Sequence, residues 1–172
     1  MRVFSEDIAR EREHSQSEIW GNIYRELFPD MTNYDRCMHA EAQKRGIDRI
    51  ITLSDGHQHT IEEKIRYKDY NDIALERWSS FEDKSLGWCL KELDCDYVLY
   101  LFWNSGRYFL IPFEKLRQSL MDNILEWENN YKILQTRNRG VRSMYTTVSV
   151  CVPTSVLIDV IPEIRYGEVE NE

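Results

Sequence analysis

The sequence predicts a protein of the α/β or α+β class, in which helices flank a mixed sheet. Two observations predict this class: apolar residues recur at helical spacing before residue 46, and short β-branched runs separated by turn residues follow it. The 172 residues, 42% of them hydrophobic, suit one domain with its own core. We therefore expect a single domain over 1–172, with N-terminal helices over 5–46, a core over 46–128, and a basic loop plus a strand over 129–172.

Two helices are predicted before the strands begin. The first extends to Phe28 and includes an aromatic stripe of Trp20, Tyr24 and Phe28, after which a proline ends the helix. The second is expected over 32–46, because a Thr or an Asn can cap its start and a glycine closes its end.

The strand predictions follow from β-branched runs and turn residues. Residues 47–53 and 59–67 are extended runs around the dipeptide Asp55-Gly56, which is a strong hairpin signal. The most apolar run, 96–103, predicts a central strand. The other predicted elements are an extended segment over 71–80, a short helix over 82–93, a strand over 107–113, a helix over 113–130, and a basic loop, a strand and a terminal segment near 153–161.

Charge and composition narrow the class of function. A net charge of −8 argues against a protein that coats nucleic acid through bulk positive charge. The N-terminus lacks the apolar core of a secretion signal, and no stretch approaches the roughly 18 apolar residues of a membrane span. We expect a cytoplasmic protein without a membrane partner. The four cysteines form no CxxC pair, which favours reduced thiols over disulfides or zinc.

One short window has the chemistry of phosphodiester hydrolysis. Asp48 begins the first strand of the hairpin, and Glu62 and Lys64 share one face of the second strand, because side chains alternate along a strand. The turn can bring Asp48 beside Glu62. Two carboxylates can hold magnesium, which polarises the phosphorus centre and lowers the pKa of the attacking water. Lys64 can orient that water, and the backbone carbonyl of Glu63 can serve as a further metal ligand.

The segment GIDRIITLSDGHQHTIEEKIR resembles the core signature of the PD-(D/E)xK nuclease superfamily, which has the restriction-endonuclease-like fold. The match consists of Asp48, Glu62 and Lys64, with Glu63 at the x position, although Ile47 stands where many members have proline. The resemblance covers roughly 33–115 and includes an αβββαβ order. It implies an endonuclease that uses Mg²⁺ (or Mn²⁺) and has DNA as its partner.

Further residues could join such a site. Glu41 resembles an extra acidic residue that some members carry, and Glu76 could face the metal or the substrate from the third strand. For both, ordinary solvation is at least as good an interpretation. A set of basic residues could contact nucleic acid: Arg66, Arg77, Lys132, Arg137, Arg139 and Arg142. The last four could instead complement a helix terminus and continue as a solvated loop.

Several alternatives stay open at this point. The three central residues could form the solvated edge of an amphipathic hairpin, and the chain could be a catalytically silent nuclease-fold protein that acts as a protein- or nucleic-acid-binding module. His57 and His59 have a spacing that can bind zinc, but a solvated turn is favoured. Cleavage of both strands of a duplex often needs two symmetric sites, so a homodimer is a further expectation. Its interface could be the aromatic stripe, although packing on the sheet is the default.

Overall fold

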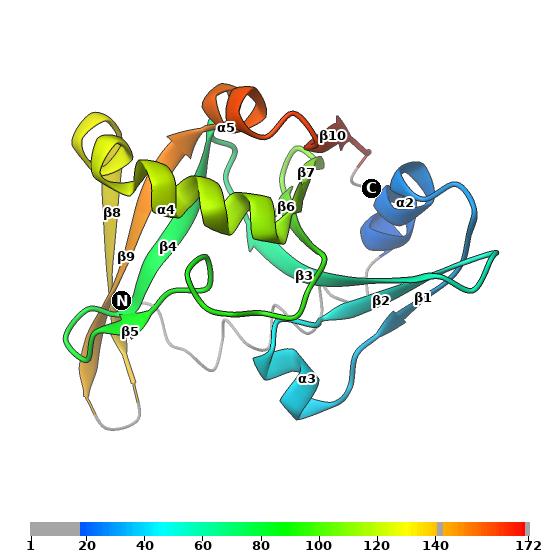
Figure 1. The fold of residues 1–172 in the computed structure, drawn as a ribbon, viewed down its shortest axis with the longest axis horizontal. Coiled ribbons are helices and arrows are strands. Elements are labelled where there is room, and N and C mark those ends of the chain that lie inside the picture. Colours follow the sequence, from blue (N-terminus) through cyan, green and yellow to red (C-terminus); the bar gives the residue numbers. More distant parts are fainter. Residues whose placement is uncertain (1–17, 141–142, 171–172) are drawn as a thin grey trace. The chain divides into compact units, whose positions relative to one another are not determined.

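The computed structural model describes residues 18–140 and 143–170 and has a mixed α+β architecture (Figure 1). Contacts group these residues into two compact units. The first, here called the site unit, comprises 18–70, 92–116 and 161–170. The second unit comprises 71–91, 117–140 and 143–160. The predicted mixture of helices and sheet is confirmed, whereas the single domain over 1–172 stays a prediction.

The site unit contains a six-stranded mixed sheet in the order β1-β2-β3-β6-β7-β10. Its strands are β1 (Met31–Arg36), β2 (Arg49–Leu53), β3 (Gln58–Arg66), β6 (Tyr97–Phe102), β7 (Arg107–Pro112) and β10 (Arg165–Glu168). The pair β2–β3 is an antiparallel hairpin, as predicted, and β6–β7 is a second one, whereas β3 and β6 run parallel. The strand β6 lies inside the sheet, which confirms its prediction as a central strand.

The helix α2 (Glu18–Leu27) packs on one face of this sheet. The apolar cluster joins helix residues to strand residues: Ile19, Trp20, Ile23, Tyr24 and Leu27 with Ile51, Ile61, Leu99, Leu101, Tyr108 and Leu110. The aromatic stripe is buried in this core, which confirms the default interpretation rather than an outer interface. The homodimer stays a prediction.

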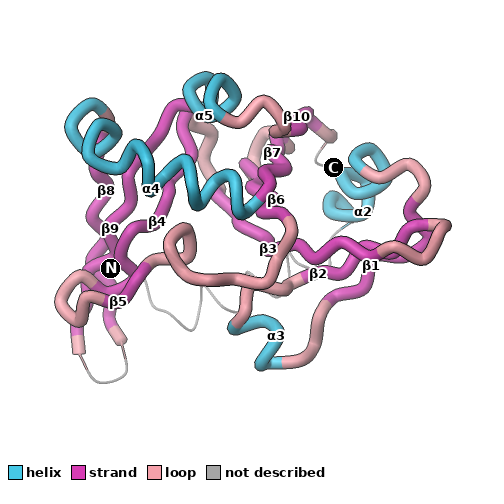
Figure 2. Tube along the Cα trace, in the orientation of Figure 1, coloured by secondary structure: helices cyan, strands magenta, loops and turns pink. Residues whose placement is uncertain are grey.

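The second unit contains a four-stranded antiparallel sheet in the order β5-β4-β9-β8 (Figure 2). Its strands are β4 (Asp72–Ser80), β5 (Ser85–Leu86), β8 (Lys132–Arg139) and β9 (Met144–Pro153). The helix α5 (Thr154–Val160) follows directly. The helix α4 (Phe113–Asn130) has the predicted bounds, and its residues up to Leu116 belong to the site unit.

The helix predicted over 32–46 is wrong in its first half. The strand β1 occupies that half, and only the short helix α3 (Ala40–Lys44) follows. Thr32, which was expected as a helix cap, instead donates from its hydroxyl to the carbonyl of Thr52, 3.1 Å away on β2. Cross-strand pairing has therefore overridden a local capping signal.

The helix predicted over 82–93 is also wrong, because turns and the short strand β5 occupy it. The Ser80 hydroxyl donates to the Asp83 carboxylate at 2.7 Å and closes a local turn, which competes with helix formation. Lys84 adopts a left-handed φ of 53°. At Gly87, a Cβ atom would overlap the carbonyl oxygen of Glu76, so the close approach of two backbone segments requires glycine.

Long-range pairing also changes the predicted strand order. The strand β4 was expected beside the β2–β3 hairpin, but it pairs with β9 in the second sheet, so the αβββαβ order is wrong at its third strand and its second helix. The prediction of a basic loop is wrong at its start, because the strand β8 extends from Lys132 to Arg139. The strand β10 was not predicted.

Two further predictions concern cysteines and membranes. Cys37, Cys89, Cys95 and Cys151 are free and buried, so their expected place in core or core-adjacent structure is confirmed. Among the helices of residues 18–140 and 143–170, none has the length and apolar character of a membrane span.

Candidate active site

The start of the β2–β3 hairpin fixes Asp48 against β3. The backbone N–H of Asp48 donates to the carbonyl of Ile61 at 2.9 Å, which extends the ladder by one residue beyond β2. The Asp48 carboxylate oxygen Oδ2 accepts a hydrogen bond from the backbone N–H of Glu63, also at 2.9 Å. Because two bonds from neighbouring positions on β3 hold this residue, its carboxylate has a defined place beside the strand.

Glu62 and Lys64 form an ion pair on one face of β3. The Lys64 ammonium donates to Oε1 of Glu62, and the residue Glu62 is only 7% exposed. The Lys64 side chain is 27% exposed, so this face of the pair has access to solvent. Asp48 also interacts directly with the Glu62 carboxylate. The structure therefore brings Asp48, Glu62 and Lys64 together, as the alternation along the strand predicts.

The charges of this cluster are incompletely balanced. Burial raises the pKa of Glu62, Lys64 opposes the shift, and the neighbouring Asp48 carboxylate raises it further. Two carboxylates and one ammonium leave an excess of negative charge at a largely buried position. A divalent cation would remove this repulsion, so the electrostatics of the cluster fit a metal ion.

The available donors determine which metal would fit. The N–H and C=O of one strand residue face the same side of the strand, so the Glu63 carbonyl is directed to the strand edge at which Asp48 lies. The cluster therefore has two carboxylates and a carbonyl, all oxygen donors. Within 18–140 and 143–170, no group of three or more His, Cys, Asp and Glu side chains forms a metal site. This donor set suits Mg²⁺ or Mn²⁺, since Mg²⁺ usually keeps several of its waters.

A buried thiol borders the cluster. Burial raises the pKa of the Cys95 thiol to about 12, and the negative charge of Glu62 contributes to this shift. The thiol is therefore protonated at neutral pH in the metal-free protein.

The opposite face of β3 carries a charged cluster that sequence reasoning missed. The Glu63 side chain accepts hydrogen bonds from Arg49 Nε at 2.9 Å and from the Tyr24 hydroxyl at 2.6 Å. The Arg49 and Glu63 side chains are only 6% and 8% exposed. Burial raises the pKa of Glu63, and Arg49 and the hydrogen bond from Tyr24 oppose the shift. A signal was present, because Arg49 interrupts an apolar strand and must find a partner if buried.

The two additional carboxylates have partners of their own outside the hairpin. The Glu41 side chain is 85% exposed and forms a salt bridge of 2.8 Å with Lys44 on α3. Glu76 lies on β4 of the second unit, where its Oε1 accepts a hydrogen bond from the backbone N–H of Trp88 at 3.3 Å. The side chain of Glu41 is therefore solvated, which agrees with the alternative interpretation of this residue.

The basic residues divide between the two units. Arg66 ends β3 on the face of Glu62 and Lys64, as predicted from its spacing. Arg77, in the second unit, forms an ion pair with Glu128 of α4. Lys132, Arg137 and Arg139 are exposed on β8, and Arg142 lies outside the described residues.

The two histidines contact each other edge-on beside the Asp-Gly turn. The rings of His57 and His59 are 4.7 Å apart in an edge-on arrangement, and His59 lies 3.9 Å from the Asp96 carboxylate. This contact adds one carboxylate to the pair, and no zinc-type cluster is present in the described part of the chain.

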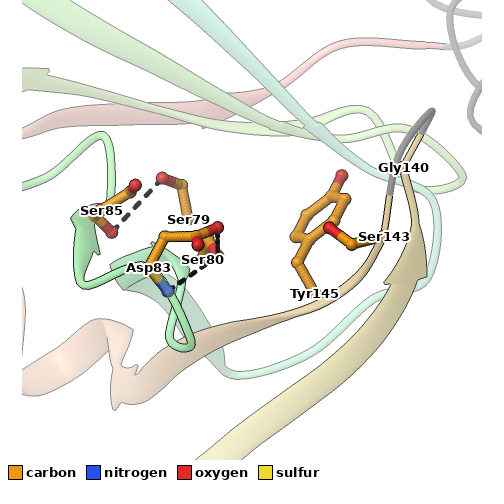
Figure 3. Close-up of a pocket in the computed structure, with 7 residues that line it drawn as sticks. All are labelled: Ser79, Ser80, Asp83, Ser85, Gly140, Ser143 and Tyr145. Atoms are coloured by element: carbon orange, nitrogen blue, oxygen red, sulfur yellow. Dashed lines mark hydrogen bonds between the residues drawn. The ribbon is translucent and has the colours of Figure 1, made fainter.

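The second unit contains an open pocket of about 450 Å³ (Figure 3). Its lining is mostly hydroxyl-bearing: Ser79, Ser80, Asp83, Ser85, Gly140, Ser143 and Tyr145. None of the predicted site residues lines it. Ser80 and Asp83 bond to each other there, as the dashed lines show.

The site unit thus assembles an oxygen-donor cluster and an ammonium on one hairpin. The cluster can hold a hard divalent cation next to a group that orients water. Comparisons with protein-family models, with curated proteins and with solved structures give no match.

Proposed function

We propose that this chain is a Mg²⁺-dependent nuclease of the PD-(D/E)xK type. One observation carries the proposal: Asp48, Glu62 and Lys64 converge on one face of the β2–β3 hairpin, with Glu62 almost fully buried. Two carboxylates in contact raise the energy of the metal-free protein, and such an arrangement is typical of functional sites.

The restriction-endonuclease-like fold is part of this proposal. A hairpin whose second strand carries the signature supports it, as does the parallel pairing of β3 with β6. The helix α3 before β2 supports it as well, although it is short. The strand β4 departs from the expected order, so the support comes from the hairpin and the parallel strand next to it.

Asp48 and Glu62 would hold the metal ion, with the Glu63 carbonyl as a third protein donor. When bound, Mg²⁺ polarises the phosphodiester and lowers the pKa of the attacking water. Lys64 pairs with Glu62, where an ammonium can orient the water and offset the charge that develops as the P–O bond breaks. DNA is the proposed substrate because of the resemblance of the signature to nucleases that cleave DNA.

Cleavage assays test the proposal directly. Supercoiled plasmid and single-stranded DNA are incubated with Mg²⁺ or Mn²⁺ and with the wild type, Lys64→Ala or Lys44→Ala. Lys44 is an exposed lysine on α3 that pairs with Glu41, and it serves as a matched control. We expect Lys64→Ala to reduce the cleavage rate on the order of a hundredfold or more, while Lys44→Ala retains the wild-type rate. A wild type that leaves both DNAs intact, or equal rates for all three proteins, would contradict the proposal.

A further inference from the structure

The face of β3 that carries Glu62 and Lys64 continues with a basic row. Arg66 follows Lys64 by two positions, so it lies on the same face. Arg66 pairs with Phe102 of β6, and Phe102 pairs with Arg107 of β7. Paired residues on neighbouring strands face the same side of a sheet. The register therefore places Arg66 and Arg107 on the site face, one on each side of Phe102.

Aromatic rings orient both guanidinium groups. The Arg66 guanidinium carbon lies 3.8 Å from the centre of the Tyr70 ring, and that of Arg107 lies 4.9 Å from the centre of the Phe102 ring. Nη2 of Arg107 also donates to the backbone carbonyl of Tyr70 at 2.6 Å. Tyr70 thus contacts both arginines, Arg66 through its ring and Arg107 through its carbonyl. Tyr70 is 38% exposed. Both cations belong to one corner of the sheet.

We infer that Arg66 and Arg107 form a binding subsite for backbone phosphates of a nucleic-acid strand next to the cleavage centre. The inference rests on the proposed function, since it names how the substrate of that site is held. Ring-stacked guanidinium groups bind phosphate oxygens through charge-assisted hydrogen bonds. For Arg107 these bonds would come from its Nη groups, because its Nε is buried. The exposed Tyr70 ring adds a surface on which a sugar or a base can stack.

Spacing and charge support this occupant. Two residues along a strand correspond to about 7 Å, so the row begins one short step from Lys64. Lys68 is exposed in the loop after β3 and adds a further positive charge. Asp69, a carboxylate in the same loop, accepts a hydrogen bond from the Ser105 hydroxyl. On a protein with a net charge of −8, a local basic row selects for a polyanion.

The test measures binding without cleavage. Fluorescence anisotropy follows a labelled oligodeoxynucleotide in EDTA over a series of salt concentrations. The proteins are the wild type, Arg66→Gln, Arg107→Gln, the double variant and Arg25→Gln, whose exposed arginine on α2 contacts Asn22. We expect each subsite variant to weaken binding on the order of tenfold, and each to lower the slope of log affinity against log salt by about one. Arg25→Gln should match the wild type.

A second pair of variants separates binding from folding. Arg66→Lys and Arg107→Lys keep the charge but lose the planar fork, so they should retain the salt slope and part of the affinity. An affinity and a slope in the double variant equal to those of the wild type would overturn the inference, and so would a wild type that does not bind the oligonucleotide. Because EDTA removes metal ions, this result is independent of the cleavage assay, and each proposal can fail alone.

Discussion

Glu62 and Glu63 are neighbours on β3, but their side chains lie on opposite faces of the strand and have different surroundings. Glu62 shares its face with Asp48 and Lys64, and its face keeps an excess negative charge and access to solvent through Lys64. Glu63 lies on the face that α2 covers, where Arg49 and Tyr24 satisfy it.

The difference indicates two roles for buried charge. On the α2 face, the carboxylate has a guanidinium and a hydroxyl at hydrogen-bonding distance, which is the arrangement of a structural pair. On the site face, the carboxylates of Asp48 and Glu62 repel each other. This repulsion favours the binding of a cation between them. The backbone N–H of Glu63 connects the faces because it holds the Asp48 carboxylate.

The largest expected difference is in stability. Glu63→Gln leaves the buried Arg49 without its counter-charge, so we expect it to lower the free energy of unfolding by about 3–5 kcal/mol. Glu62→Gln removes a carboxylate that is disfavoured in its ionised form, so its free energy of unfolding should equal or exceed that of the wild type at neutral pH. Urea denaturation of both variants in EDTA measures the two values. A larger loss for Glu62→Gln than for Glu63→Gln would reverse the assignment of the two faces.

A smaller effect is expected for the hydroxyl of Tyr24. Tyr24→Phe keeps the ring in the core and removes the hydroxyl, which donates to Glu63 and also interacts with Arg49, so it should destabilise the fold by about 1–3 kcal/mol. Tyr34→Phe is the control, because the Tyr34 ring packs against Tyr24 in the same region. Thermal unfolding compares the two variants. Equal melting temperatures would show that the Tyr24 hydroxyl does not contribute to the buried pair.

The pH dependence of stability should show the smallest effect. Because the pKa of Glu62 is raised in the folded state, the Glu62 carboxyl group stays protonated to higher pH in the folded protein than in the unfolded chain. Stability from Glu62 is therefore present below the ordinary carboxylate pKa and is lost as pH rises through its folded value. Relative to Glu62→Gln, the wild type should become less stable as pH rises above about 4.5. Denaturation curves at several pH values measure this difference, and a difference that is constant with pH would contradict it.

The sequence predicts local features of this molecule better than it predicts partners. Alternation along β3 correctly separates Glu62 and Lys64 from Glu63, because that period is a property of the strand itself. The partner of Glu63 was not predictable, since Arg49 reaches it only through the register of β2 and β3. The strand β4 was predicted as a strand but not in its sheet, because its partner β9 lies far along the chain. The two wrong helix predictions have the same cause, in that pairing and turn contacts outweighed local propensity.

Metal binding is the most direct test of the claim that the site face holds a divalent cation. Isothermal titration calorimetry with Mg²⁺ or Mn²⁺ compares the wild type with Asp48→Asn, Glu62→Gln and Glu168→Gln, in which an exposed carboxylate on β10 is the matched control. We predict that the wild type and Glu168→Gln bind the metal equally, and that Asp48→Asn and Glu62→Gln each lose affinity on the order of tenfold or more. No binding by the wild type, or equal binding by all four proteins, would contradict the account.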